Sequence, residues 1–204
     1  MIPSCRATID GLDLGPRGSL QGDTRFVSVL TEFGARVERL AKALRTTGGS
    51  SIQPIDASLA DMPDTAMTAA ALACFASPTS ANPTATSTLR GLRTLRVKET
   101  DRLEALRVEL SKIGANVEIF QDGDDEGLRI TPPQDALHWS AQSSRPVPPV
   151  HFDTYNDHRM AMALALVGLR RPNVYIRNPA CVAKTYPTYW RDFAKLYGAS
   201  EPAI

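Results

Sequence analysis

The sequence predicts an α/β protein made of repeats of one unit, in the order strand, buried helix, strand, helix, strand and strand. Two observations indicate the repeat. Residues 33–38 resemble residues 113–118, which lie 80 positions later. Residues 64–67 and 157–160 both read Asp-x-x-Met, and each begins an alanine-rich stretch with almost no charge. With spacings of 80 and 93 residues, a chain of 204 residues holds about two units and part of a third.

The elements can be placed in chain order. A strand is expected at 6–9, a helix from the N-cap Asp23 to Gly34, and strands at 36–38 and 42–47. The next unit contains an uncharged helix at 62–75, a strand at 88–92, a helix at 103–113 and strands at 116–120 and 128–131. The last contains a second, nearly uncharged helix at 157–167 with its ionisable groups at the start, a strand at 173–177 and a helix that begins at Lys184. Helices that are apolar all round are buried, whereas 77–87 and 133–150 are irregular by composition.

Bulk properties exclude several classes of protein. The 23 basic and 22 acidic residues give a net charge of +1, which does not favour binding to nucleic acid or to anionic membranes. The three cysteines are far apart and lack metal-ligand spacing, so neither a disulfide framework nor a zinc site is indicated. No apolar run reaches the roughly 18 residues that span a bilayer. We therefore expect a soluble, intracellular protein that needs no metal or cofactor.

A charged cluster at residues 96–102 precedes the apolar ladder Leu103, Leu106, Leu110 and Ile113. The cluster thus lies at the start of a helix, where free backbone N–H groups favour an anion. Lys98 and Arg102 are four residues apart and can share a face, with Glu99 between them. The alternative is an ordinary solvated helix start, because charged first turns are common.

The repeated units should bring their helix starts together. This would pool four cations with two or three carboxylates, a setting suited to a small, doubly anionic ligand. By spacing alone, Asp64 is equally explained as an N-cap, the cations as surface charges and the lone histidine as structural. The expected group consists of Asp64, Lys98, Glu99, Arg102, His158, Arg159 and Lys184.

Three motifs, 96–102, 154–162 and 184–187, closely resemble those of the 5-enolpyruvylshikimate-3-phosphate synthase family, and 19–23 and 62–64 also fit. The match follows the order of nearly the whole chain. The resemblance implies an enolpyruvyl transferase-like fold, with 1–204 corresponding to the C-terminal one of the family's two domains. The related UDP-N-acetylglucosamine enolpyruvyl transferase shares the fold but not these signatures, and it is kept as an alternative.

The resemblance also implies a reaction and a set of roles. The 5-hydroxyl of shikimate-3-phosphate adds to phosphoenolpyruvate, and phosphate leaves, in the shikimate pathway of aromatic amino-acid biosynthesis. Asp64 would be the base at the hydroxyl, Glu99 would carry the proton at the methylene, and Lys98 would lie near the hydroxyl. Arg102, Arg159 and Lys184 would clamp phosphoenolpyruvate. His158 would bond within the site, and Asp157 would cap its helix and orient Arg159.

The chain also departs from the family pattern. Thr94 stands where many members have Asn or Ser, so its substrate contact is an open expectation, and 77–88 and 133–150 look longer than usual. The chain begins where the family's second half begins. We therefore expect it to be poorly active alone, or to be a non-catalytic half that needs a separate N-terminal half. The family implies a cytoplasmic location, or a plastid if a transit peptide was lost with that half.

Overall fold

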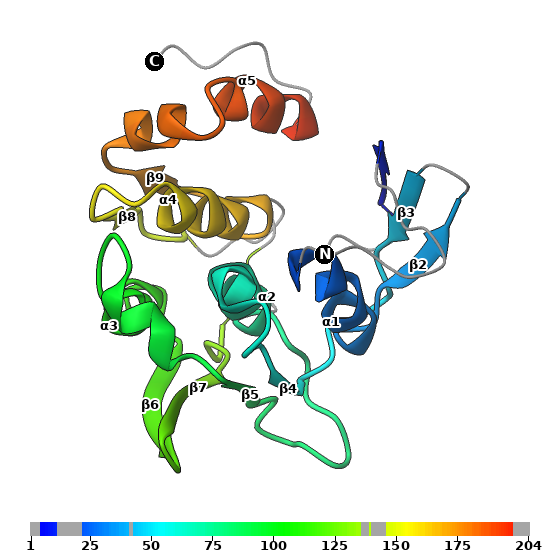
Figure 1. The fold of residues 1–204 in the computed structure, drawn as a ribbon, viewed down its shortest axis with the longest axis vertical. Helices are drawn as coiled ribbons and strands as arrows, with labels where there is room; N and C mark the ends of the chain where they lie inside the picture. Colours follow the sequence, from blue (N-terminus) through cyan, green and yellow to red (C-terminus); the bar gives the residue numbers. More distant parts are fainter. Residues whose placement is uncertain (1–4, 12–21, 41–42, 136–138, 140–145, 198–204) are drawn as a thin grey trace.

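A computed structural model describes residues 5–11, 22–40, 43–135, 139 and 146–197 of the chain. Within these ranges the strands form a three-stranded sheet in the order β1-β3-β2, a four-stranded sheet in the order β4-β5-β7-β6, and the pair β8-β9. Figure 1 shows α2 between α1 on one side and α3 on the other, with α4 lying across it. Residues 19–21 of the 19–23 motif lie outside the described ranges.

One repeat is complete and confirms the predicted order of elements. Its first two strands are parallel, and the later pairs are antiparallel. The first strand was not located from the sequence, because Asp-Ala-Ser contains none of the β-branched or aromatic residues that favour strands. The unit consists of β4 (Asp56–Ser58), α2 (Ala66–Ala73), β5 (Ser87–Arg90), α3 (Arg102–Ser111), β6 (Asn116–Asp122) and β7 (Asp125–Thr131).

The other two units repeat parts of the complete one. The antiparallel sheet β1-β3-β2 has the arrangement of β5-β7-β6, with α1 in the place of α3. The parallel pair β8-β9 has the arrangement of β4-β5, with α4 in the place of α2. Their elements are β1 (Arg6–Asp10), α1 (Phe26–Glu32), β2 (Arg36–Arg39), β3 (Ala43–Thr47), β8 (Val150–Phe152), α4 (His158–Ala165), β9 (Val174–Ile176) and α5 (Tyr189–Ala194).

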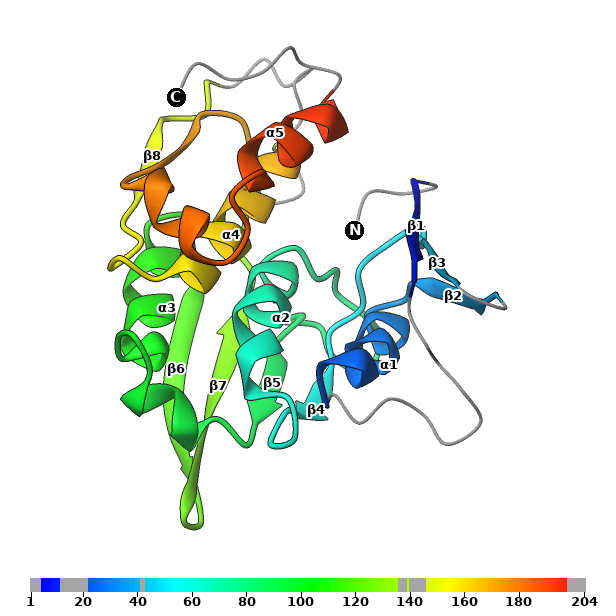
Figure 2. The same ribbon diagram turned by 45° about the horizontal axis from the view of Figure 1, so that its top comes forward.

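The two uncharged helices form the centre of the core, as their composition predicts. In α2, six of eight residues are buried, and α4 is buried at six of eight positions. The helices pack against each other, and α2 also contacts α3 and β5; Figure 2 shows this packing from a second direction. Alanine makes up five of the eight residues of α2 and three of the eight of α4, and these small side chains let the two helices pack closely. The packing also brings the N-terminal ends of α2 and α4 together with that of α3, as their shared ion pairs show.

Two predicted helix starts were wrong. Asp23 lies in a 3₁₀ turn, Gly22–Arg25, and α1 begins at Phe26 without a side-chain cap. Lys184 does not begin the last helix: it ends a 3₁₀ helix, Pro179–Lys184, and α5 begins at Tyr189. The physical reason is Pro187, since the residue before a proline is pushed out of the helical region and the two helices cannot join.

Gly91 makes possible a close approach between two connections. Its φ is +78°, and an added Cβ would lie 2.6 Å from the backbone nitrogen of Ala60. We expect Gly91→Ala to destabilise the fold by about 2 to 4 kcal/mol, from left-handed strain and overpacking together. Urea unfolding measures the loss. Gly123→Ala is the matched control, because Gly123 has φ +62° but nothing within 4 Å of an added Cβ. Equal stability of the two variants would contradict the clash.

Candidate active site

The site lies at the start of α3, but the free backbone N–H groups of that helix end are not what forms it. Asp101 is the N-cap, and its carboxylate accepts a hydrogen bond from the Glu104 amide at 3.1 Å. Arg96 donates to the other oxygen of Asp101 at 2.7 Å. The cap therefore takes up one of the free N–H groups expected to attract an anion, and side chains rather than the helix end form the site.

Arg102, the first residue of α3, is the centre of the cluster. Its side chain is only 1% exposed. Nε donates to Asp157 at 2.7 Å, Nη1 to Asp64 at 2.8 Å and Nη2 to Glu99 at 2.9 Å. The planar guanidinium thus joins three carboxylates from three elements. A ligand anion can reach Arg102 only by taking the place of Asp64 or Glu99.

Asp64 lies in the 3₁₀ turn Pro63–Thr65 just before α2, with its side chain 26% exposed. It is not the N-cap of α2; that position belongs to Thr65, which makes no side-chain capping bond. The carboxylate instead contacts Arg159 at 3.2 Å and Lys98 at 3.6 Å, besides Arg102. A carboxylate held by three cations and still reached by solvent is suited to accept a proton from a bound hydroxyl.

Glu99 lies on the other side of Arg102 and is 31% exposed. It accepts from Lys184 at 3.2 Å, and His158 Nδ1 lies 3.8 Å away. Its own backbone amide, the hydrogen bond from Lys184 and the charges of Arg102 and Lys184 lower the pKa of this carboxyl below its ordinary value. In this arrangement Glu99 is therefore ionised and can act as a base. Loss of the Lys184 charge would raise the pKa of Glu99.

Asp157 ties α4 to α3. It is fully buried and caps α4 as expected, accepting from the amides of Arg159 at 2.8 Å and Met160 at 3.3 Å. The same carboxylate also holds Arg102, which the sequence did not indicate. Arg159, 35% exposed, is left facing Asp64.

The structure brings together the seven residues pooled in the sequence analysis, but the backbone at Lys98 and the separately expected residue Thr94 differ from expectation. Lys98 lies in extended backbone before α3 rather than on a helix face, because the helix begins only at Arg102. Thr94 is an exposed residue of the 3₁₀ helix Arg93–Val97, and among the described residues it makes none of the cluster's bonds. The cluster as a whole holds four cations, Lys98, Arg102, Arg159 and Lys184, against the carboxylates Asp64, Glu99 and Asp157.

A cavity of about 350 Å³ opens beside the cluster. Its lining includes Glu99 and Lys184, together with residues that sequence reasoning missed, namely Tyr155, Asn156, Ala180 and Cys181.

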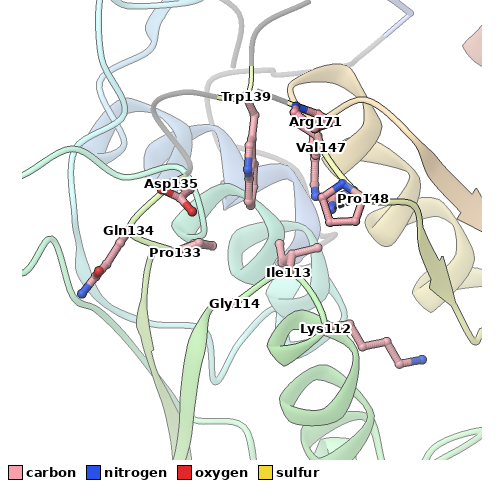
Figure 3. Close-up of a pocket in the computed structure, with 11 residues that line it drawn as sticks. Lys112, Ile113, Gly114, Pro133, Gln134, Asp135, Trp139, Val147, Pro148 and Arg171 are labelled. Atoms are coloured by element: carbon pink, nitrogen blue, oxygen red, sulfur yellow. Dashed lines mark hydrogen bonds between the residues drawn. The ribbon is translucent and has the colours of Figure 1, made fainter. Parts of the chain in front are cut away.

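A larger cavity, about 460 Å³, lies at the far end of α3, around Gly114, Trp139 and Arg171 (Figure 3). It shares no lining residue with the first cavity. There the guanidinium of Arg171 lies over the Trp139 ring at 5.2 Å and donates to the backbone carbonyls of Pro172 and Pro148. The charged group of Arg171 is thus bound within the fold. The smaller cavity is therefore the one that belongs to the charged cluster.

Residues 8–193 match the model of the family described as EPSP synthase (3-phosphoshikimate 1-carboxyvinyltransferase). The chain belongs to the EPSP synthase family. Among curated members, the 3-phosphoshikimate 1-carboxyvinyltransferase of Idiomarina loihiensis is 42% identical over 180 residues, covering 88% of this chain and 37% of that protein. The one from Nitrosomonas europaea is also 42% identical, covering 87% and 37%. The chain thus spans a little over a third of the length of these EPSP synthases.

Solved structures confirm the fold. The EPSP synthase of Acinetobacter baumannii matches with a TM-score of 0.67 at 23% identity, covering 95% of this chain and 42% of that one. The enolpyruvyl transferase NikO of Streptomyces tendae matches with a TM-score of 0.61 at 20% identity, covering 97% and 39%. In the described ranges, no helix is long and apolar enough to cross a membrane, and no group of three or more His, Cys, Asp or Glu has the arrangement of a metal site.

His158 gives the site a measurable pH dependence. Burial lowers the pKa of its imidazole below 6.5, opposed by Asp157 and Glu99 and assisted by Arg159 and Lys184. Between the folded and unfolded pKa values the unfolded chain binds more protons. The stabilising effect of the neutral ring is therefore complete above pH 6.5 and is lost as the pH falls to the folded pKa. We expect His158→Gln to lose less stability than the parent between about pH 7.5 and 5.5 in urea unfolding. Equal losses in both proteins would contradict this.

Proposed function

We propose that this chain supplies one wall of the active site of a 3-phosphoshikimate 1-carboxyvinyltransferase. The reaction transfers the carboxyvinyl group of phosphoenolpyruvate to the 5-hydroxyl of shikimate-3-phosphate and releases phosphate. The observation that carries the proposal is the bridge Asp64–Arg102–Glu99, surrounded by Lys98, Arg159 and Lys184. Two carboxylates separated by one guanidinium are able to serve two separate proton transfers.

The two carboxylates would act on different atoms. Asp64 removes the proton of the 5-hydroxyl as its oxygen bonds to C2 of phosphoenolpyruvate, and Lys98 lies beside that oxygen. Glu99 delivers a proton to the methylene carbon, which gives a tetrahedral intermediate. Loss of a proton from the new methyl group to Glu99 and departure of phosphate then restore the double bond. The proton that Asp64 took from the hydroxyl passes to the departing phosphate, Glu99 recovers the proton that it gave, and no oxidant or reductant is needed.

The cations would hold the charges of phosphoenolpyruvate. Arg159 and Lys184 are the half-exposed and exposed members of the cluster, at 35% and 61%. Both now contact carboxylates, which a phosphate or carboxylate group of the ligand would replace. When Lys184 turns to the ligand, Glu99 loses a hydrogen-bond donor and a nearby positive charge. Its pKa rises, which makes the protonated form of Glu99 easier to reach than in the free chain.

This coupling between Lys184 and Glu99 is testable without turnover. We expect Lys184→Met to raise the pKa of Glu99 toward 4.5, its ordinary value, because the hydrogen bond and charge that lower it are removed. Carbon-13 NMR titration of the glutamate side chains measures the shift. Lys195→Met is the control, since Lys195 pairs with Asp192. An unmoved Glu99 titration would contradict the coupling.

A second candidate, a non-catalytic half-enzyme, is favoured by the share of the relatives that the chain spans. The deciding experiment measures phosphate release from phosphoenolpyruvate and shikimate-3-phosphate, with and without the remaining N-terminal part of the Idiomarina loihiensis enzyme. We expect weak phosphoenolpyruvate binding but little turnover from the chain alone, because water-excluding closure needs both walls. Turnover in the mixture supports the proposal. The proposal would be refuted if the chain alone binds no phosphoenolpyruvate and the mixture shows no turnover. Ordinary turnover by the chain alone would refute the half-enzyme. Competition with UDP-N-acetylglucosamine tests the remaining alternative.

A further inference from the structure

Glu109 is a buried charged residue of α3 that takes no part in the reacting cluster. Its side chain is 0% exposed. Oε1 accepts from the Tyr155 hydroxyl at 2.8 Å, and Oε2 accepts from the Asp153 amide at 2.9 Å and from Lys112 at 2.6 Å. Burying a carboxylate is costly unless it is fully bonded. Two of these three bonds go to one short segment, 153–155, that leads into α4.

That segment contains two consecutive strained residues. Tyr155 has φ +54° and Asn156 φ +57°, both in the left-handed region. Residues other than glycine adopt this region at a cost, and they stay there only when surrounding contacts hold them. The side-chain contacts are the Tyr155–Glu109 bond on one side and, on the other, the side-chain amide of Asn178, which donates to the side-chain oxygen of Asn156 at 3.2 Å. The turn is closed by its own bond from the Asp157 amide to the Thr154 carbonyl at 2.8 Å, and these two side-chain contacts hold it from outside as well.

The strained turn determines where site residues lie. Tyr155 and Asn156 line the 350 Å³ cavity together with Glu99 and Lys184. The next three residues are Asp157, which holds Arg102, followed by His158 and Arg159. A change at the turn would thus move two residues of the cavity wall, Tyr155 and Asn156, together with the partly exposed Arg159.

The helix α3 holds this segment at two points. Arg102 and Glu109 are seven residues apart, which places them on one face about 10 Å apart along the axis. Arg102 bonds Asp157, and Glu109 bonds Asp153 and Tyr155. Burial and the bond to Glu109 raise the pKa of the Tyr155 phenol well above its usual range, so the phenol keeps its proton and remains a donor.

We infer that Glu109 is a positioning residue for the phosphoenolpyruvate site: through Tyr155 it holds the left-handed turn that presents Asn156 and Arg159 to the ligand. The inference rests on the proposed function for the identity of the ligand. The position of the turn itself is a property of the free chain.

The test compares three variants of this chain. Tyr155→Phe removes only the hydroxyl and keeps the ring and the Glu109–Lys112 pair. Glu109→Gln removes the charge. Glu104→Gln is the matched control, because Glu104 lies on the same helix but is 45% exposed and pairs with Arg107. If Glu109→Gln does not fold, Tyr155→Phe alone decides.

Phosphoenolpyruvate binding and NMR spectra of the free chain are measured on folded protein. We expect Tyr155→Phe and Glu109→Gln to weaken binding about fivefold, the effect of one lost hydrogen bond. We also expect shifted amide signals of Asn156 and Arg159 and a His158 pKa closer to 6.5, with none of these changes in Glu104→Gln.

A merely stabilising role for Glu109 would lower the melting temperature and leave all three readouts unchanged, which would overturn the inference. If the parent chain binds no phosphoenolpyruvate, the proposed function fails. The amide signals and the His158 titration of the free chain then decide the inference by themselves: altered values support it and unaltered values overturn it.

Discussion

Asp157→Ala is expected to destabilise the chain by about 3 to 5 kcal/mol, because it leaves the buried Arg102 without its main partner. Arg102 is 1% exposed and Asp157 is 0% exposed, and Nε and Nη2 of the arginine both donate to this carboxylate, at 2.7 and 3.3 Å. The same change removes the cap of α4, whose amides at Arg159 and Met160 lose their acceptor. Urea unfolding at neutral pH measures the loss.

The matched control for this prediction is Asp61→Ala. Asp61 also pairs with an arginine, Arg25 at 3.1 Å, but its side chain is 72% exposed and that of Arg25 is 58% exposed. Exposed pairs contribute about 0 to 1 kcal/mol. A loss below about 1 kcal/mol for Asp157→Ala, equal to the control, would mean that water reaches Arg102 and that the cluster is not the buried bridge described above.

Glu99→Gln is expected to lower turnover of the reconstituted enzyme by about 10² to 10⁴, the usual contribution of a positioned acid–base group. Glutamine keeps the shape of the side chain and can still accept from Arg102, but it cannot carry a proton to carbon. Phosphoenolpyruvate binding should be unchanged or tighter, because a negative charge leaves the anion site and Lys184 is freed. The predicted pattern is thus a loss in kcat without a loss in affinity.

Glu104→Gln again serves as the control, five residues away on the exposed side of α3. Single-turnover and steady-state rates with both substrates separate chemistry from binding. If Glu99→Gln turns over within a few-fold of the parent, the proton at the methylene comes from another group. If instead affinity falls while kcat is kept, Glu99 orients Lys184 rather than transferring a proton.

Much of the fold was predictable because its signals are local. The Asp-x-x-Met starts of 64–67 and 157–160, the uncharged stretches that follow, and the ladder from Leu103 to Ile113 each depend on neighbouring residues. The structure confirms these helices and the repeated unit they belong to. The strand β4 was not located because Asp-Ala-Ser has no β-branched or aromatic residue, and β8 was not located because it begins at the end of the proline-rich stretch 133–150. Lys184 was placed at a helix start because Pro187 suits the first turn of a helix, whereas in the structure the helix begins only after the proline, at Tyr189.

The site was predictable as a group of residues but not as an arrangement. The sequence indicated that Asp64, Glu99, Arg102 and Arg159 belong together, since each lies near the start of a helix. It did not indicate that Arg102 would be buried, because its partners Asp64 and Asp157 lie 38 and 55 residues away. Glu109 was missed for the same reason: Tyr155 is 46 residues distant. A signal existed, since Glu109 lies seven residues after Arg102, two turns along the same helix.

The two aspartates at the starts of α2 and α4 occupy equivalent places in two copies of one unit, and both bond the same arginine. The copies have nevertheless diverged in what they do. Asp157 is fully buried and serves only to hold the fold together, whereas about a quarter of the Asp64 side chain is exposed to solvent. Duplication of an ancestral element would account for this division of labour. Asp157 holds the Arg102 guanidinium in place, so the proton transfer proposed for Asp64 would not require the bond between α3 and α4 to break.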